Sequence, residues 1–313
     1  MSGPLPAYGD YLRAILALGR RAIRPALPAI IFVYFYRLGM GLYTELSPEG
    51  TGLREGGLPS VAAFLTLAAG YLPMLVLVYT PFLPFLDRLA GEGTARFIDA
   101  VREVLEVAWK YLVSLLAQFA IVLLPMGLLI GIAVGLVAGI SGGWMEHLRT
   151  GEDFSNALRG TILLVFLVPA MLWVVYSGLH LLFATPALVL SRRGPFASIG
   201  VSWGLVSGHF WGILGRLLTY ALVLLLASVA LSLPSTFITM ALKVSGNTNP
   251  MLKIPALVWV SGVDAFLFPF GVAALLLLYR ALVSRSSAVG TAPTAETGAP
   301  TAEYRPSSPF TFE

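Results

Sequence analysis

Long apolar runs without charged residues are the feature of this sequence that most limits its fold. Two of them, Gly57–Leu86 and Tyr111–Met145, contain no Asp, Glu, Lys or Arg. A helix needs about 20 residues to cross the hydrocarbon core of a bilayer, where backbone polar groups find no water partners. These runs therefore predict membrane-spanning helices, and the alternating pattern of a membrane β-barrel is absent from them.

The whole composition agrees with a membrane protein. The chain is 57% hydrophobic and 12% charged, and that charged fraction is about half of what soluble domains carry. We predict an all-α integral membrane protein with one six-span membrane domain at residues 1–285 and a disordered cytoplasmic tail at residues 286–313, which are rich in Ala, Thr, Pro and Ser. The predicted spans lie at about residues 26–45, 60–86, 112–141, 160–190, 212–235 and 254–280.

The basic residues between these spans predict the orientation of the chain. If the six spans are correct, 14 Lys and Arg residues fall on one side of the membrane and five on the other, with Arg37 inside a span. Short loops rich in Lys and Arg stay in the cytoplasm. We therefore expect both termini to be cytoplasmic.

Three cytoplasmic segments have apolar residues at helical spacing and polar residues on the opposite face. They are the N-terminal segment around Ile15, residues 97–111 and residues 196–210. Each predicts an interfacial amphipathic helix that precedes two spans. This order suggests a possible threefold repeat of helix pairs, whose best internal match sets Thr80-Pro81 against Thr185-Pro186.

The second of these Thr-Pro motifs begins a segment that resembles a known family. Residues 185–214 are similar to the membrane domain of bacterial glycerophosphodiester phosphodiesterases and of related six-helix membrane proteins. The matching residues are Pro186, Ala187, Gly194, Pro195, Ser202, Trp203, Gly208, His209, Phe210 and Trp211. Val201 and Ser207 stand where that family often has basic residues. The resemblance implies a bacterial inner-membrane module without phosphodiesterase activity, because the catalytic barrel, which needs about 250 residues, is absent.

The third predicted span has a regular stripe of glycine along one face. Glycine occurs at every fourth position, at Gly127, Gly131, Gly135, Gly139 and Gly143. Such a stripe lets helices approach closely, although glycine lowers helix stability. We expect it to pack inside the helix bundle, and the alternatives are self-association or the lining of a pore.

Two charged residues and one histidine fall inside predicted spans. Because an isolated charge in hydrocarbon is costly, we predict that Arg37 and Asp264 form an ion pair that joins the first and last spans, with either a structural or a transport role. We expect His180 to be neutral and hydrogen-bonded to a neighbouring helix, rather than to act as a proton relay. The sequence Gly139-Ile140-Ser141-Gly142 matches the Gly-x-Ser-Gly signature of rhomboid proteases only weakly.

These observations exclude several classes of function. The chain has no cysteine, and its three histidines are far apart in the sequence, so neither a thiolate metal site nor a local histidine metal motif is expected. A net charge of +4 without a basic patch argues against nucleic-acid binding. We expect no catalytic residues and no cofactor, and we predict a module that binds membrane lipids, other membrane subunits or itself. The alternative is a small-solute transporter or channel that uses the glycine-striped third helix.

Overall fold

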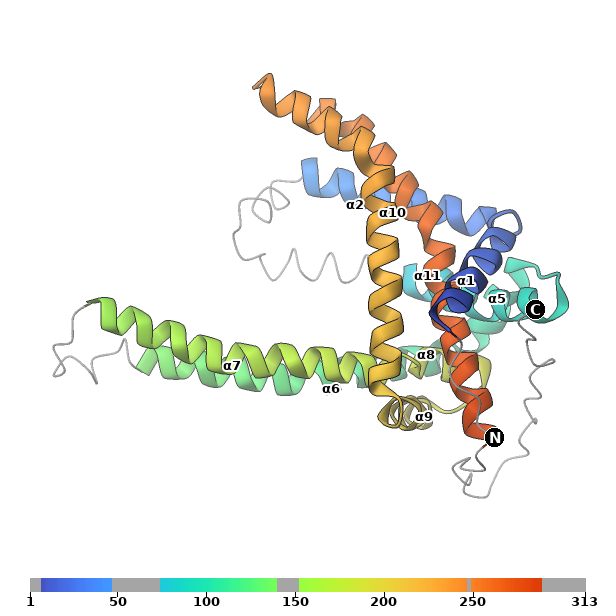
Figure 1. Ribbon diagram of the computed structural model, residues 1–313, viewed down its shortest axis with the longest axis horizontal. Coiled ribbons are helices and arrows are strands. Elements are labelled where there is room, and N and C mark those ends of the chain that lie inside the picture. Colours follow the sequence, from blue (N-terminus) through green and yellow to red (C-terminus); the bar gives the residue numbers. More distant parts are fainter. Residues whose placement is uncertain (1–6, 47–73, 140–151, 247–248, 289–313) are drawn as a thin grey trace. The chain divides into compact units, whose positions relative to one another are not determined.

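The computed structural model describes residues 7–46, 74–139, 152–246 and 249–288, and the regular secondary structure in these ranges is entirely helical (Figure 1). Four of these helices are long and apolar enough to span a membrane, or five if the bent pair formed by the first two counts as one span. The prediction of an all-helical protein is therefore confirmed for the described residues, which include these candidate membrane-spanning helices. Of the predicted second span, residues 60–73 lie outside the described residues, as do residues 289–313 of the predicted tail.

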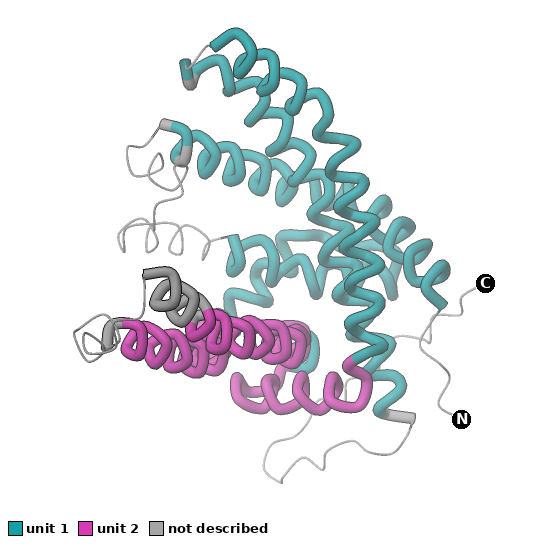
Figure 2. Tube along the Cα trace, turned by 60° about the vertical axis from the view of Figure 1, so that its left-hand side comes forward, with its two compact units in different colours: residues 1–108, 189–191, 211–313 teal, residues 109–188, 192–210 magenta. Residues whose placement is uncertain are grey.

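The chain divides into two compact units (Figure 2). The first unit comprises residues 1–108, 189–191 and 211–313, and the second comprises residues 109–188 and 192–210. The first unit is built from segments that are far apart in the sequence, because the last helix of the chain packs against the first two.

Helix α11 (Ile254–Ala288) forms the centre of the first unit. Three helices pack against it: α1 (Tyr8–Ile23), α2 (Leu27–Leu46) and α5 (Thr80–Glu92). The π-helical turn η1 (Leu75–Tyr79) leads into α5, and the short helix η3 (Pro250–Lys253) leads into α11. The core consists of fully buried side chains from these elements, among them Ile15, Phe82, Phe85, Leu276, Leu278 and Leu282.

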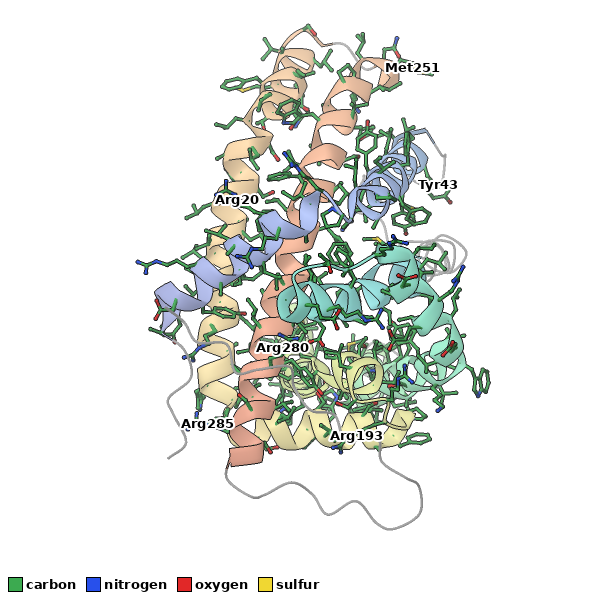
Figure 3. The ribbon with its side chains drawn as sticks, turned by 90° about the vertical axis from the view of Figure 1, so that its right-hand side faces the viewer. Arg20, Tyr43, Arg193, Met251, Arg280 and Arg285 are labelled. Atoms are coloured by element: carbon green, nitrogen blue, oxygen red, sulfur yellow. The ribbon has the colours of Figure 1, made fainter. Side chains whose placement is uncertain are left out.

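Helix α1 is amphipathic, but its buried face differs in detail from the predicted one. Tyr11, Ile15, Leu18 and Ala22 are buried at helical spacing, whereas Leu16 is exposed. In the segment around Ile15, helical spacing also brings Leu12 and Leu16 to the predicted apolar face, and of these three residues only Ile15 is fully buried. The packing partner decides the face, because α1 lies on α11 and against α5. Arg20 lies on the exposed side of α1 (Figure 3).

Helix α6 (Phe97–Gly139) is one continuous helix of 43 residues. The sequence analysis separated an interfacial helix at residues 97–111 from a span at residues 112–141, and the described chain has no break between them. Neither Gly nor Pro occurs between Phe97 and Leu124, so nothing in the local sequence ends the helix there. The amphipathic segment is therefore the first part of the span helix itself.

Three helices make up the rest of the second unit. They are α7 (Glu152–Leu181), most of α8 (Ala184–Leu190) and α9 (Pro195–Ser207). Helix α9 packs against α7, and the Trp173 indole on α7 donates a hydrogen bond to the Ile121 carbonyl of α6 at 3.2 Å. The predicted span at residues 160–190 is thus two helices that meet at residues 182–183. Helix α10 (Phe210–Val244) follows α9 and belongs to the first unit from Trp211 onward.

Candidate functional site

The interface between α2 and α11 brings the two predicted intramembrane charges together. The Arg37 Nε lies 3.9 Å from an Asp264 carboxylate oxygen, and the two side chains are 37% and 40% exposed. Both residues come from apolar helical stretches in which an isolated charge would be costly. The pair therefore lowers the cost of each charge, while a separation of 3.9 Å is longer than that of a strong charge-assisted hydrogen bond.

A second ion pair joins α2 to η3, the short helix that leads into α11. The Lys253 ammonium donates to a Glu45 carboxylate oxygen at 3.0 Å, and both side chains are mostly buried. The sequence analysis counted these residues as loop charges and did not pair them. Their positions carried a usable signal, because Glu45 follows Arg37 by two helical turns on α2, and Lys253, at the end of η3, precedes Asp264 in the chain, as antiparallel neighbours require.

A close approach of the helices lies between these two ion pairs. Gly41 is one turn from Arg37 and one turn from Glu45, and a Cβ atom placed on it would lie 3.1 Å from Leu257 Cδ2. Val33, one turn before Arg37, is buried on the same face of α2. The small residue lets α2 approach α11 closely enough for both long side chains to reach their partners.

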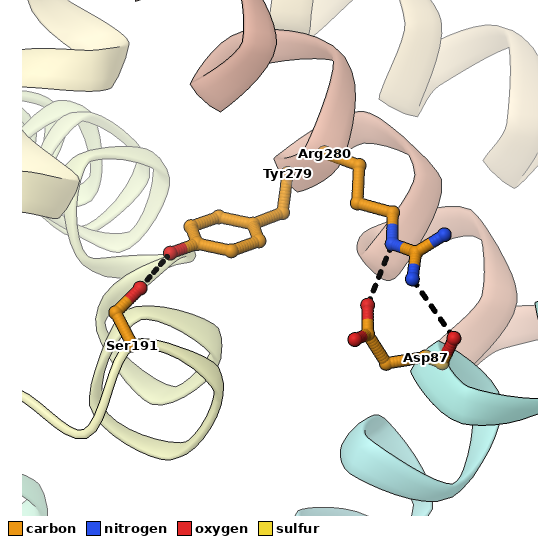
Figure 4. A network of polar contacts seen from close by, with 4 residues as sticks. All are labelled: Asp87, Ser191, Tyr279 and Arg280. Atoms are coloured by element: carbon orange, nitrogen blue, oxygen red, sulfur yellow. Dashed lines mark hydrogen bonds and ion pairs between the residues drawn. The ribbon is translucent and has the colours of Figure 1, made fainter. Parts of the chain in front are cut away.

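A second polar network fixes other segments of the first unit to α11 (Figure 4). The Arg280 Nε donates to the Asp87 carboxylate at 2.6 Å, and its terminal nitrogen donates to the Asp87 carbonyl at 2.8 Å. The neighbouring Tyr279 hydroxyl shares a hydrogen bond of 3.0 Å with Ser191. Adjacent residues of α11 thus hold both α5 and Ser191, the residue that follows α8. The sequence analysis did not identify this network, because its members belong to predicted loop ends far apart in the sequence.

The N-terminal helix is held by aromatic and cationic contacts. The Tyr11 hydroxyl donates to the Ala274 carbonyl of α11 at 2.8 Å. The guanidinium of Arg216, a largely buried residue of α10, lies 5.0 Å from the centre of the Tyr8 ring, within reach of a cation–π interaction. These contacts make α1 a packed part of the first unit.

The glycine stripe of α6 faces open space within the described part of the chain. A Cβ atom placed on Gly127, Gly131 or Gly135 would meet no heavy atom within 4 Å. Gly139 ends α6, and Gly143 lies outside the described residues, as do Ile140, Ser141 and Gly142 of the weak protease-like match. Gly127, Gly131 and Gly135 therefore do not pack against another described helix of the second unit.

The segment that carries the family resemblance, residues 185–214, begins just after the junction of α7 and α8. His180 is buried in the second unit, and its ring lies 4.2 Å from that of Tyr176, 4.5 Å from that of Trp203 and 5.8 Å from that of Phe210, measured between ring centres. Its Nδ1 lies 2.8 Å from the Tyr176 carbonyl of its own helix. The structure thus places His180 among aromatic rings, with a polar partner on α7.

Ser202 has a specific structural role at this junction. Its hydroxyl donates to the His180 carbonyl at 2.5 Å and accepts from the Phe183 amide at 3.0 Å. The junction interrupts the regular hydrogen bonds of the helix, and buried backbone groups need partners. Ser202 supplies both a donor and an acceptor, so α9 stabilises the break between α7 and α8.

Most of the other residues that carry the family resemblance lie at or near the ends of α8, α9 and α10. Gly194 is the N-cap of α9 and Pro195 its first residue, as proline favours. Pro186 is buried on α8, Gly208 and His209 form the break before α10, and Trp211 is exposed. The face of α9 that carries Ser198 and Ser202 is buried, while Phe196 is exposed.

The interactions observed at these sites are ion pairs, hydrogen bonds and aromatic and apolar packing. Within the described ranges, no group of three or more His, Asp or Glu side chains could hold a metal ion. Comparison of the chain with protein-family models, with curated proteins and with solved structures finds no match.

Proposed function

We propose that this chain is a non-catalytic, multi-pass membrane module that acts by binding membrane lipids and partner membrane subunits. The observation that carries the proposal is the large apolar surface that its long helices leave uncovered. In the most apolar 18-residue window, 6% of the residues of α6 and 6% of those of α10 are buried, against 61% for α11. Such a surface must be covered by lipid or protein, because its exposure to water is unfavourable.

The polar contacts support a structural role for the charged residues. The Arg37 ion pair joins α2 to α11, the Lys253 ion pair joins α2 to η3 just before α11, and Arg280 joins α5 to α11. They hold a frame around α11, while the exposed apolar helices α6, α7 and α10 are available for binding. This division between a packed centre and open helices favours a binding module over an enzyme.

The proposal includes a topology and a location. It places six spans in the inner membrane of a bacterium, with the segment at residues 60–86 as the second span and both termini in the cytoplasm. The surplus of Lys and Arg on one side of the predicted spans supports this orientation. The resemblance of residues 185–214 to the membrane domain of glycerophosphodiester phosphodiesterases supports the bacterial location.

Native mass spectrometry of the protein, extracted gently from membranes, tests the proposal. We expect the chain to retain phospholipids, further subunits or a second copy of itself. A protein that remains a bare monomer under conditions that preserve lipid on a control membrane protein would overturn it.

The glycine stripe offers a matched pair of variants for the same measurement. If a second copy or a partner packs on the stripe, Gly131→Leu removes that species from the spectrum, because the larger side chain prevents close approach. Gly178→Leu is the control, since a Cβ atom at Gly178 of α7 also meets open space. Equal loss in both variants would show that the stripe has no special part in assembly.

A further inference from the structure

A cavity of about 510 Å³ lies where α5 ends and α6 begins. Gly93, with φ +75°, ends α5 in the left-handed region and turns the chain toward α6. The cavity is an open depression, and Glu92, Thr94, Arg96 and Asp99 at its wall are exposed. Its lining consists of Arg88, Glu92, Thr94, Ala95, Arg96 and Asp99.

The lining carries charges of both signs in equal number. Two guanidinium groups, from Arg88 and Arg96, stand beside the carboxylates of Glu92 and Asp99. The Arg88 guanidinium forms an ion pair with Glu103 of α6, and this contact restricts its orientation at the cavity wall. A simple ion would be attracted by two of these side chains and repelled by the other two, so the lining suits a ligand that carries both charges.

The surroundings of the cavity indicate where that ligand resides. Ile98 and Leu105 are exposed on one face of α6, and Trp109, which is 75% exposed, continues the same face one turn further. The uncharged run that begins at Tyr111 follows on the same helix. Tryptophan favours the boundary between membrane and water, so this part of α6 fits the level of the lipid headgroups.

We propose that this cavity binds the headgroup of a zwitterionic phospholipid that carries a phosphate and a primary ammonium group. The arginines bind the phosphate oxygens, because guanidinium groups form strong charge-assisted hydrogen bonds with phosphate. Glu92 and Asp99 accept hydrogen bonds from the ammonium group, and the acyl chains lie along the exposed face of Ile98 and Leu105. The proposal rests on the lipid-binding function proposed above and assigns it a site and a lipid class.

The test measures which lipid stays bound to the full-length protein. The protein is equilibrated in detergent with equal amounts of phosphatidylethanolamine and phosphatidylglycerol and examined by native mass spectrometry. We expect phosphatidylethanolamine to be retained in preference. Arg96→Gln removes a charged contact to the phosphate and should lower that retention about tenfold, as expected for one charge-assisted hydrogen bond.

Matched variants on the same helix separate the site from general charge effects. Arg102→Gln removes an exposed arginine that does not line the cavity, and it should leave retention unchanged. Asp99→Asn should remove the preference for phosphatidylethanolamine, whereas Glu106→Gln should keep it. Equal effects of Arg96→Gln and Arg102→Gln would overturn the site, while lipid retained by every variant would still support the proposed function.

A competition experiment distinguishes a membrane lipid from a soluble phosphate ester. Glycerophosphoethanolamine carries the same headgroup without acyl chains, so it should compete only weakly with the lipid. Displacement of the lipid by an equal concentration of glycerophosphoethanolamine would overturn the assignment to a membrane lipid.

Discussion

Replacement of Ser202 with alanine tests whether α9 stabilises the break between α7 and α8. The change removes one hydroxyl that bonds both the His180 carbonyl and the Phe183 amide. All three residues are buried, so water cannot readily replace the lost partner. We expect the free energy of unfolding to fall, and the second unit to loosen at this junction first.

The size of the effect follows from the two hydrogen bonds. Loss of a partner by a buried polar group costs about 1–3 kcal/mol, and two groups are affected. The measured contribution of a hydrogen bond between membrane helices to stability is lower, about 0.6 kcal/mol on average, because the unfolded chain finds other partners in the membrane. We therefore expect Ser202→Ala to destabilise the protein by about 2 kcal/mol.

Hydrogen exchange followed by mass spectrometry gives a local readout of the same change. The peptide that contains Phe183 should exchange faster by about tenfold or more, since 1.4 kcal/mol corresponds to a factor of ten. Unfolding of the purified protein in denaturing detergent measures the global loss. Both experiments use the folded full-length protein.

Ser207→Ala is the control for this prediction. Ser207 lies on the same helix, is exposed, and its hydroxyl donates only to the carbonyl of Trp203 one turn earlier. Its replacement should change stability by less than about 0.5 kcal/mol. If Ser202→Ala and Ser207→Ala give the same stability and the same exchange at Phe183, the role assigned to Ser202 is refuted.

The interface of α2 and α11 gives two further predictions. Replacing Arg37 or Asp264 singly with alanine should cost about 1 kcal/mol in detergent unfolding, and exchanging the two charges should restore most of it; the pairing is rejected if the exchanged variant is no more stable than the single ones. Gly41→Leu should lower the unfolding midpoint, because its side chain would meet Leu257, whereas Gly39→Leu, which faces open space, should leave it unchanged or raise it. Equal midpoints for the two leucine variants would contradict the close approach of these helices.

The sequence predicts the helical class well because its strongest signal is a property of single segments. An uncharged run such as that after Tyr111 must satisfy its own backbone, and only a helix does so within one segment. Arg37 and Asp264 were also predictable as partners, since each is the only residue with a full charge in its apolar run, residues 26–43 and 254–279, and isolated charges there are costly.

The remaining features depend on which helices meet. Periodicity shows that Ile15 and Leu16 lie near one another on α1, but the position of α11 decides that only Ile15 is buried. Lys253 and Glu45 resemble ordinary loop charges until α2 and α11 are placed together. Ser202 resembles any polar residue on an interfacial helix, because the break that it stabilises lies in another helix.

The continuity of α6 has a mechanical consequence. At 1.5 Å per residue, its 43 residues extend about 65 Å, well beyond the 40–45 Å of a bilayer with its headgroups. The helix must therefore either tilt steeply or project from the membrane. A thicker bilayer would draw it upright and a thinner one would tilt it further. Because neither Gly nor Pro interrupts the helix before Pro125, such tilting would also move the charged residues at its start. A change in membrane thickness would then alter the position of Asp99 and of the cavity beside it.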